Sequence, residues 1–359
     1  MINSRCKRLL ERGSASGMDA MLITSPVNMR YFSGFTGDSG CLLITESRQV
    51  LYTDFRYTIQ AKEQTGGSFE IRDFKTAEMP LWQQVSLELE KQGCRYCGYE
   101  DETMTVAVLN NYSRMKCTLG AASKFISSIR CIKTQDEIDK IVKAQSIAEA
   151  AFNKVLEMIA PGMTERDVAI ELDYFMKKCG AEEPSFDTII ASGPNGALCH
   201  AIPSDRKLER GDLVVMDFGA KYMGYCSDMT RTIAIGEPCD ELKKIYKIVQ
   251  EAQALTLRAV RPGITGEQLD AIARECIKAR GYGECFGHGL GHGFGLEVHE
   301  APYANRVSKD VFAPGMTITV EPGIYVEGLG GVRIEDCVIV TENGHFNPVT
   351  VTKDLIIVE

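Results

Sequence analysis

A short pattern occurs twice in the second part of this chain. Pro161-Gly-Met-Thr164 precedes a stretch of helical character that ends at Gly180, and Pro262-Gly-Ile-Thr265 precedes another that ends at Gly281. Both pairs of landmarks lie 101 positions apart. A period of this length is too long for a stacked solenoid. It is typical of two αβ halves related by a pseudo-twofold axis.

The repeat brings acidic residues into register. Two matching apolar runs end at Asp217 and at Glu321, and Asp228 and Glu335 follow them by eleven and fourteen residues. An ionised carboxylate beside buried residues needs a cation or a hydrogen-bond donor. The glycines between the members of each pair predict hairpins, on which the four carboxylates can converge.

Histidines are concentrated in one Gly-rich segment. The chain has five, and three of them lie within the fourteen residues from Gly287 to Glu300. Surface or core histidines should scatter, whereas glycine lets the backbone approach a ligand closely. We therefore expect a functional site that includes His200, His288, His292 and His299.

The acids and one imidazole together predict a cation site. Four carboxylates and a neutral histidine carry about four negative charges, which balance two divalent ions. An oxygen-rich donor set suits Mn²⁺, Fe²⁺ or Co²⁺ better than a thiolate-bound structural zinc. Two such metals, ~3.5–4 Å apart, can share a water and lower its pKa. The alternative is that the acids are ordinary residues at strand ends, which their duplication disfavours.

The first ~130 residues read as a separate α/β domain, at a typical domain size of about 150 residues. It contains no histidine, and a capping box at Thr134-Gln-Asp-Glu137 opens a long helix beyond it. We therefore predict one domain over residues 1–130 and a second over 131–359. Within the first, strands are predicted at 20–24, 41–45 and 49–53, and a helix at 81–91.

Composition excludes several classes of partner. Asp and Glu number 49 against 40 Lys and Arg, a net charge of −9 that disfavours nucleic acid and anionic membranes. The N-terminus lacks the apolar run of a signal peptide. Thirteen cysteines in such a chain indicate reduced thiols and a cytoplasmic location. Cys94 and Cys97 form an isolated C-x-x-C, which we interpret as two small buried hydrophobes rather than a redox or metal site.

At the acids and histidines the sequence resembles the pita-bread metallopeptidases, which include methionyl aminopeptidase, Xaa-Pro aminopeptidase and Xaa-Pro dipeptidase (prolidase). The resemblance covers residues ~130–359 and implies an α+β pita-bread domain after the α/β domain. It implies two divalent ions, most simply Mn²⁺, with Co²⁺, Fe²⁺ or Zn²⁺ as alternatives. Asp228 and Glu335 would bridge them. The implied metal ligands are Asp217, Asp228, His292, Glu321 and Glu335.

The resemblance also implies roles around the metals. Glu321 would be the general base, while His200, His288 and His299 would hydrogen-bond the substrate and stabilise the tetrahedral intermediate. Arg333 would brace the bridging carboxylates, and Tyr325 would place an aromatic hydroxyl near the site.

Two branches of the family remain open. The stretches 31–37 and 52–57 resemble aminopeptidases, and Tyr303 stands where some dipeptidases place an arginine, so we favour an Xaa-Pro aminopeptidase. Arg306 lies close enough to hold a dipeptide carboxylate, so the dipeptidase is the alternative. A non-catalytic binding module is the second alternative. The expected partners are short peptides with proline in second position and, by resemblance, a second copy in a homodimer.

Overall fold

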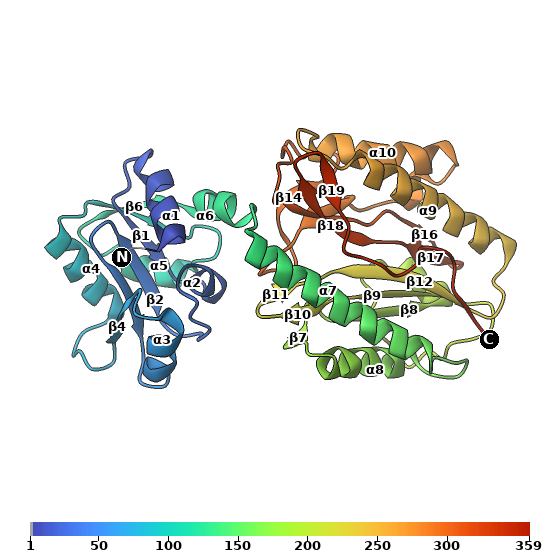
Figure 1. The fold of residues 1–359 in the computed structure, drawn as a ribbon, viewed down its shortest axis with the longest axis horizontal. Coiled ribbons are helices and arrows are strands. Elements are labelled where there is room, and N and C mark those ends of the chain that lie inside the picture. Colours follow the sequence, from blue (N-terminus) through green and yellow to red (C-terminus); the bar gives the residue numbers. More distant parts are fainter. Residues whose placement is uncertain (1–2) are drawn as a thin grey trace. The chain divides into compact units, whose positions relative to one another are not determined.

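The computed structural model describes residues 3–359, which divide into two compact units. The first ends at Arg130 and the second runs from Cys131 to Glu359. Over residues 3–359, no helix is both long and apolar enough to cross a bilayer. The first unit has one sheet, and the strands of the second unit form several smaller sheets (Figure 1).

The first unit contains a six-stranded mixed sheet in the order β4-β3-β2-β1-β5-β6. The strands predicted at 20–24, 41–45 and 49–53 are present as β1, β2 and β3, joined in antiparallel pairs. Apolar side chains such as Leu22, Leu43, Val50 and Leu89 form its core. The elements are α1 (Ser4–Ser14), β1 (Ala20–Ile23), α2 (Pro26–Ser33), β2 (Cys41–Thr45), β3 (Gln49–Thr53), α3 (Thr58–Thr65), β4 (Glu70–Asp73), α4 (Leu81–Gln92), β5 (Tyr96–Tyr99), α5 (Val106–Tyr112), β6 (Thr118–Ala121) and α6 (Ser123–Arg130).

The second unit begins with the expected long helix. Each of its two halves contains two helices, and the second of them begins with a capping box in both halves. Capping boxes that involve Thr134, Thr164 and Thr265 start three of its helices. The second helix of each half has 14 residues. These helices lie outside the strands of the unit (Figure 1). They are α7 (Gln135–Leu156) and α8 (Glu165–Lys178) in the first half, and α9 (Asp240–Ala259) and α10 (Gly266–Ala279) in the second.

Each half also wraps an antiparallel pair of strands around a shorter inner hairpin. In the first half β9 pairs with β12, with Asp217 opposite Thr230, and the inner β10–β11 hairpin turns at Met223 with positive φ. In the second half β15 pairs with β18, with Val320 opposite Asp336, around β16–β17. The strands and short 3-10 helices are β7 (Glu183–Pro184), β8 (Ile189–Ser192), η1 (Gly193–Ala197), β9 (Leu213–Phe218), β10 (Ala220–Tyr222), β11 (Tyr225–Cys226), β12 (Met229–Ile235), η2 (Gly283–Cys285), β13 (Gly291–Gly293), β14 (Glu300–Ala304), β15 (Thr317–Val320), β16 (Gly323–Val326), β17 (Gly330–Arg333), β18 (Asp336–Thr341), β19 (Gly344–Phe346) and β20 (Ile357–Val358).

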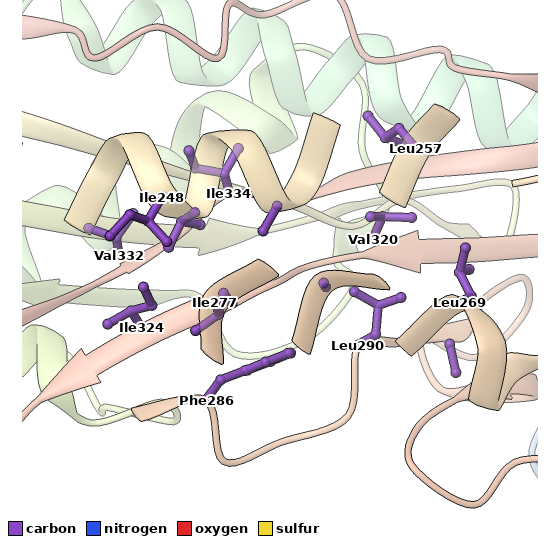
Figure 2. Close-up of a cluster of buried hydrophobic side chains, with 14 of the residues drawn as sticks. Ile248, Leu257, Leu269, Ile277, Phe286, Leu290, Val320, Ile324, Val332 and Ile334 are labelled. Atoms are coloured by element: carbon purple, nitrogen blue, oxygen red, sulfur yellow. The ribbon is translucent and has the colours of Figure 1, made fainter. Parts of the chain in front are cut away.

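A large apolar core fixes the second half against its helices. Ile248 of α9 and Ile277 of α10 belong to one buried cluster with Val320 of β15 and Val332 of β17 (Figure 2). Burial of each such side chain contributes about 1.5–3 kcal/mol relative to exposure. This core holds the strands whose ends carry Glu321 and Glu335.

An ion pair next to this core is almost completely shielded from water. Arg231 donates to Asp336 Oδ1 at 2.8 Å, and both side chains are at most 1% exposed. Lys353 donates to the other carboxylate oxygen at 2.8 Å. Burial alone would raise the pKa of Asp336, but the two cations hold it below its ordinary value. The pair therefore ties β12, β18 and the C-terminal segment together.

We expect Asp336→Asn to destabilise the second unit by about 3 kcal/mol, because it leaves a buried guanidinium without a counter-charge. Its thermal midpoint should fall by about 6 °C or more. The matched control is Glu251→Gln, which breaks an exposed pair with Arg280 on the same unit. Exposed pairs contribute about 0–1 kcal/mol, so the control should change little. Equal shifts for both variants in calorimetry would contradict this account.

Candidate metal centre and active site

Three acids from both halves meet at the ends of their strands. Asp217 lies in β9, Asp228 directly precedes β12, and Glu335 directly precedes β18. Each offers a carboxylate oxygen, and these atoms lie within 4.8 Å of one another. The acids converge because the two halves are built alike. In each half an acid directly precedes the outer strand that follows the inner hairpin.

The second half completes the group with His292 of β13 and Glu321, which directly follows β15. His292 Nε2 lies 3.6 Å from Asp228 Oδ2 and 3.4 Å from Glu321 Oε1. Nδ1 of the same ring lies 3.1 Å from the carbonyl oxygen of Gly293. Donation of the Nδ1 proton to that carbonyl leaves the Nε2 lone pair directed at the carboxylates, the orientation of a metal-ligating histidine.

The glycines beside His292 let neighbouring backbones come close. A Cβ at Gly291 would lie 2.1 Å from the carbonyl oxygen of Thr319, and one at Gly293 would lie 2.4 Å from that of Ala301. Larger residues here would push β13 away from the strands on either side. The Gly-His-Gly sequence thus places the imidazole among the acids.

Burial and mutual repulsion shape the protonation of this cluster. Burial is the largest cause that raises the pKa of Asp228 and of Glu335 well above the ordinary range, and the neighbouring acids raise both further. Burial also raises the pKa of Glu321 to about 8, although the charge of Arg333 opposes it. These carboxylates cannot all be ionised side by side without compensating positive charge.

The donor set fits divalent cations. Asp217 Oδ1 is buried and has no hydrogen-bond partner among residues 3–359. Burial lowers the pKa of His292 to about 4, which keeps its imidazole neutral and able to act as a ligand. Carboxylate oxygens around one imidazole suit hard or borderline divalent ions. The five predicted ligands are therefore brought together by the fold.

Arg333 is placed differently from the expectation that it braces the bridging acids. Its Nη2 donates to Asp217 Oδ2 at 2.6 Å, and its Nε donates to Thr230 Oγ1 at 3.0 Å. Thr230 in turn donates to Glu335 Oε2 at 2.7 Å. The guanidinium thus reaches Glu335 only through a threonine. Because it is buried against Asp217, it binds one strand-borne acid directly instead.

Tyr325 and His288 extend this network toward the cavity. Arg333 Nη1 donates to the Tyr325 hydroxyl at 2.9 Å, and that hydroxyl lies 2.9 Å from His288 Nε2. His288 Nδ1 lies 2.7 Å from the carbonyl oxygen of Gly289. Burial lowers the pKa of His288 to about 4, so the ring is neutral. It accepts from Tyr325 and is fully engaged.

The acids and histidines line a cavity of about 760 Å³. This volume lies within the range of about 300–1,000 Å³ found for small-molecule sites. His200 and His299 reach it with exposed side chains, while apolar residues such as Ile189 and Val298 form part of its wall. The remaining histidine, His345, lies in β19 and faces the carbonyl of Val260. All of the predicted site residues except Tyr325 line the cavity, and Tyr325 contacts two residues that do.

Comparison with known proteins places the chain by both of its units. Residues 5–132 match the creatinase/prolidase N-terminal domain, and residues 139–342 match the model of metallopeptidase family M24. The chain belongs to metallopeptidase family M24. Its fold is the pita-bread fold of that family, with the α/β domain in front, which confirms the predicted fold class.

Three relatives of this M24 chain match almost end to end. A structure of an Xaa-Pro dipeptidase from Bacillus anthracis has a TM-score of 0.94 and 43% identity, and the match covers 98% of this chain and 99% of that one. An X-Pro aminopeptidase from Thermotoga maritima gives 0.91 and 40%, covering 99% and 100%. The Xaa-Pro dipeptidase of Pyrococcus furiosus is 41% identical over 96% of this chain and 97% of its own. All three relatives are named as peptidases that act at proline, so the description they share is a proline peptidase of family M24.

Sequence reasoning missed the groups that hold the ligands. Thr319 Oγ1 accepts from the His292 amide at 3.0 Å and lies 3.2 Å from Glu321 Oε1, to which it donates. Thr230 plays the corresponding part for Glu335. The available signal was threonine within otherwise apolar, buried strands, where a hydroxyl needs a partner.

Helix α10 holds the loop that carries His288. Arg274 donates to the carbonyl oxygens of Phe286 and His288, each at 2.8 Å, and forms a bidentate pair with Asp270. Asp270 also accepts from the Leu290 amide at 3.1 Å.

Cys94 and Cys97, the isolated C-x-x-C pair, lie in the first unit, where burial raises the pKa of both thiols. This agrees with cysteines that pack rather than react.

We expect metal-free protein to lose stability as the pH rises. The folded state raises the pKa of Glu321 from 4.5 to about 8, so its stabilising contribution is complete below about pH 4.5 and is lost toward pH 8. With a chelator, the thermal midpoint of the second unit should fall between about pH 5 and 8. Saturating Mn²⁺ should remove this fall, because the cation takes the place of the proton.

The matched control for this experiment is Glu321→Gln, which cannot titrate. In chelator its midpoint should fall less steeply than that of the wild type over the same interval. Parallel slopes for the two proteins in calorimetry would show that Glu321 does not carry the proton.

Proposed function

We propose that this chain is an Xaa-Pro dipeptidase that hydrolyses the bond before proline with two divalent cations. The observation that carries the proposal is the cluster of buried acids from both halves, gathered with one neutral imidazole on the wall of a peptide-sized cavity. The residues that would hold the cations are Asp217, Asp228, His292, Glu321 and Glu335.

The dipeptidase replaces the aminopeptidase that the sequence led us to favour. Relatives named Xaa-Pro dipeptidase match over 96–98% of this chain, and therefore over both units. A first unit of this kind thus does not separate the two activities, because an X-Pro aminopeptidase matches over 99% of the chain as well. The relative from Thermotoga maritima keeps the aminopeptidase as a second candidate.

When bound, the cations supply a Lewis acid and a nucleophile at neutral pH. Glu321 is the general base, since it faces the centre and its burial favours proton uptake. His200 and His299 reach the cavity with exposed rings and hydrogen-bond the scissile carbonyl as negative charge develops on it. His288 acts indirectly. Its ring holds the Tyr325 hydroxyl in place, and it makes no direct contact with the substrate in this proposal.

The bond before proline has no N–H, so an enzyme that grips this group gains nothing there. This cavity can act on the carbonyl instead, because both carboxylates and histidines line it. Ile189 and Val298 offer apolar surface for the proline ring. The oxygen-rich ligand set favours Mn²⁺, with Co²⁺, Fe²⁺ and Zn²⁺ as alternatives. The homodimer and the cytoplasmic location stay predictions.

The decisive experiment compares an Xaa-Pro dipeptide with an Xaa-Pro-Yaa tripeptide, each assayed with Mn²⁺ and with a chelator. We expect the dipeptide to be cleaved faster and the chelator to abolish cleavage. Glu321→Gln should lower turnover by at least about 100-fold, since it removes both a ligand and the base. Cleavage of the tripeptide alone would establish the aminopeptidase, and inertness toward both with metal bound would leave a binding module.

Arg306 is the proposed anchor for the substrate carboxylate. It is exposed and follows Asn305, which lines the cavity. Arg306→Gln should raise KM for the dipeptide about tenfold, the loss expected from one charge-assisted hydrogen bond. KM for the corresponding dipeptide amide, which lacks the carboxylate, should not change.

Lys309→Gln is the matched control, because Lys309 is an exposed cation of the same loop that pairs with Glu267. It should leave both KM values as they are. An equal rise in KM for acid and amide would remove Arg306 from this role.

A further inference from the structure

The ring of His200 depends on its backbone for its position. It is exposed on the cavity wall and, within residues 3–359, makes no hydrogen bond to another group. His288, in contrast, has partners for both ring nitrogens. The position of His200 is therefore set by the backbone of residues 193–203, which follow β8 and precede β9 in the chain.

Glu165, the first residue of α8, fastens both ends of that segment. Its Oε1 accepts from the Ser192 amide and hydroxyl, each at 2.7 Å, and from Asn195 Nδ2 at 3.1 Å. Its Oε2 accepts from the Ser204 amide at 3.0 Å and hydroxyl at 2.6 Å. One carboxylate thus joins a point eight residues before His200 to a point four residues after it.

The environment of Glu165 keeps this carboxylate ionised. The side chain is completely buried. Burial raises its pKa, but hydrogen bonds from Ser204 and Ser192 outweigh burial and hold it below the ordinary value. Its place in the first turn of a helix adds favourable interaction with the helix dipole. An anion with this many donors is expensive to remove or to neutralise.

The second half of the repeat makes the same turn without a carboxylate. The position equivalent to Glu165 is Gly266, where a Cβ would lie 2.0 Å from the carbonyl oxygen of Tyr303. The backbone bridge before the helix is present in both halves, at Thr164–Lys207 and at Thr265–Val311. The fold therefore does not require an acid here. In the second half the corresponding histidine, His299, packs against the ring of His292, with centroids 4.3 Å apart. Within residues 3–359 the ring of His200 has no such neighbour, and its half is the one that carries the acid.

We propose that Glu165 is a positioning residue that holds His200 against the substrate through the segment it fastens. This rests on the proposed function, in which His200 contacts the scissile group. Glu165 itself lies outside the cavity wall and contacts neither the substrate nor a proposed ligand. Its effect on the reaction passes through the histidine.

A double-mutant cycle tests the proposal in Mn²⁺-loaded protein with the Xaa-Pro substrate that the wild type cleaves. Glu165→Gln retains the shape but turns an acceptor oxygen into a donor that faces other donors. We expect it to lower kcat at least tenfold with little change in KM, and His200→Ala to do the same. The double variant should be no slower than His200→Ala alone. Losses that multiply in the double variant would overturn the proposal.

Glu149→Gln is the matched control. Glu149 is another buried carboxylate of this unit, and it accepts from the Thr350 amide and hydroxyl, each at 2.6 Å. Its replacement should lower the thermal midpoint as Glu165→Gln does, yet its effect on kcat should be small and independent of His200. Loss of kcat in proportion to stability in both variants would make Glu165 merely structural and overturn the proposal. Should Glu165→Gln not fold, Glu165→Asp gives the same comparison with the charge retained.

Hydrogen exchange separates failure of this proposal from failure of the proposed function. Glu165→Gln should speed deuterium uptake at residues 193–203, with uptake at 286–300 unchanged. Unchanged uptake at 193–203 would overturn the proposal, whatever the protein hydrolyses. A wild type that cleaves neither Xaa-Pro substrate while the exchange result holds would reject the proposed function and the role in turnover, and would leave Glu165 as a fastener of the loop only.

Discussion

Electrostatic repulsion among buried carboxylates is the constraint on which the rest of the second unit depends. Asp228 and Glu335 are at most 4% exposed, and Asp217 and Glu321 face the same space. A fold that gathers these groups must offset their charge, or the acids will take up protons. The Arg333 guanidinium supplies one positive charge through Asp217, and Thr230 and Thr319 supply hydroxyl donors. The remaining negative charge is what makes the centre attractive to cations.

The duplication explains how the acids can meet, but the two halves are not equivalent. Each half places an acid on either side of an inner hairpin, so equivalent strand ends point to one centre. The imidazole comes from the second half alone, where Gly291 and Gly293 allow β13 to approach its neighbours. The supports differ as well: Glu165 fastens one histidine segment, whereas Asp270 and Arg274 hold the other. The repeat thus fixes where the four carboxylates lie. The residues that occur in only one half hold the histidines of the two halves in different ways.

Much of this arrangement could be predicted because it depends on spacing. The register of Asp217 with Glu321 and of Asp228 with Glu335 follows from local alternation and turn residues, and the structure brings all four together. The partner of Arg333 could not be predicted, because a guanidinium can reach several acids and only the packing selects Asp217. The choice between dipeptidase and aminopeptidase could not be fixed from the sequence for a related reason. In the proposed function it depends on the far end of the substrate and on the loop with Arg306, whose conformation no periodic pattern fixes.

The loop around residues 303–310 has a consequence for how such a protein can change over generations. The carboxylates lie at the ends of strands that a large apolar core holds in place, whereas Tyr303 and Asn305 at the start of this loop line the cavity. Mutations in the loop can therefore reshape the cavity wall without disturbing the carboxylates. Enzymes with different peptide preferences can diverge from one such ancestor by drift in the loops, and a laboratory library confined to residues 303–310 would explore the same space.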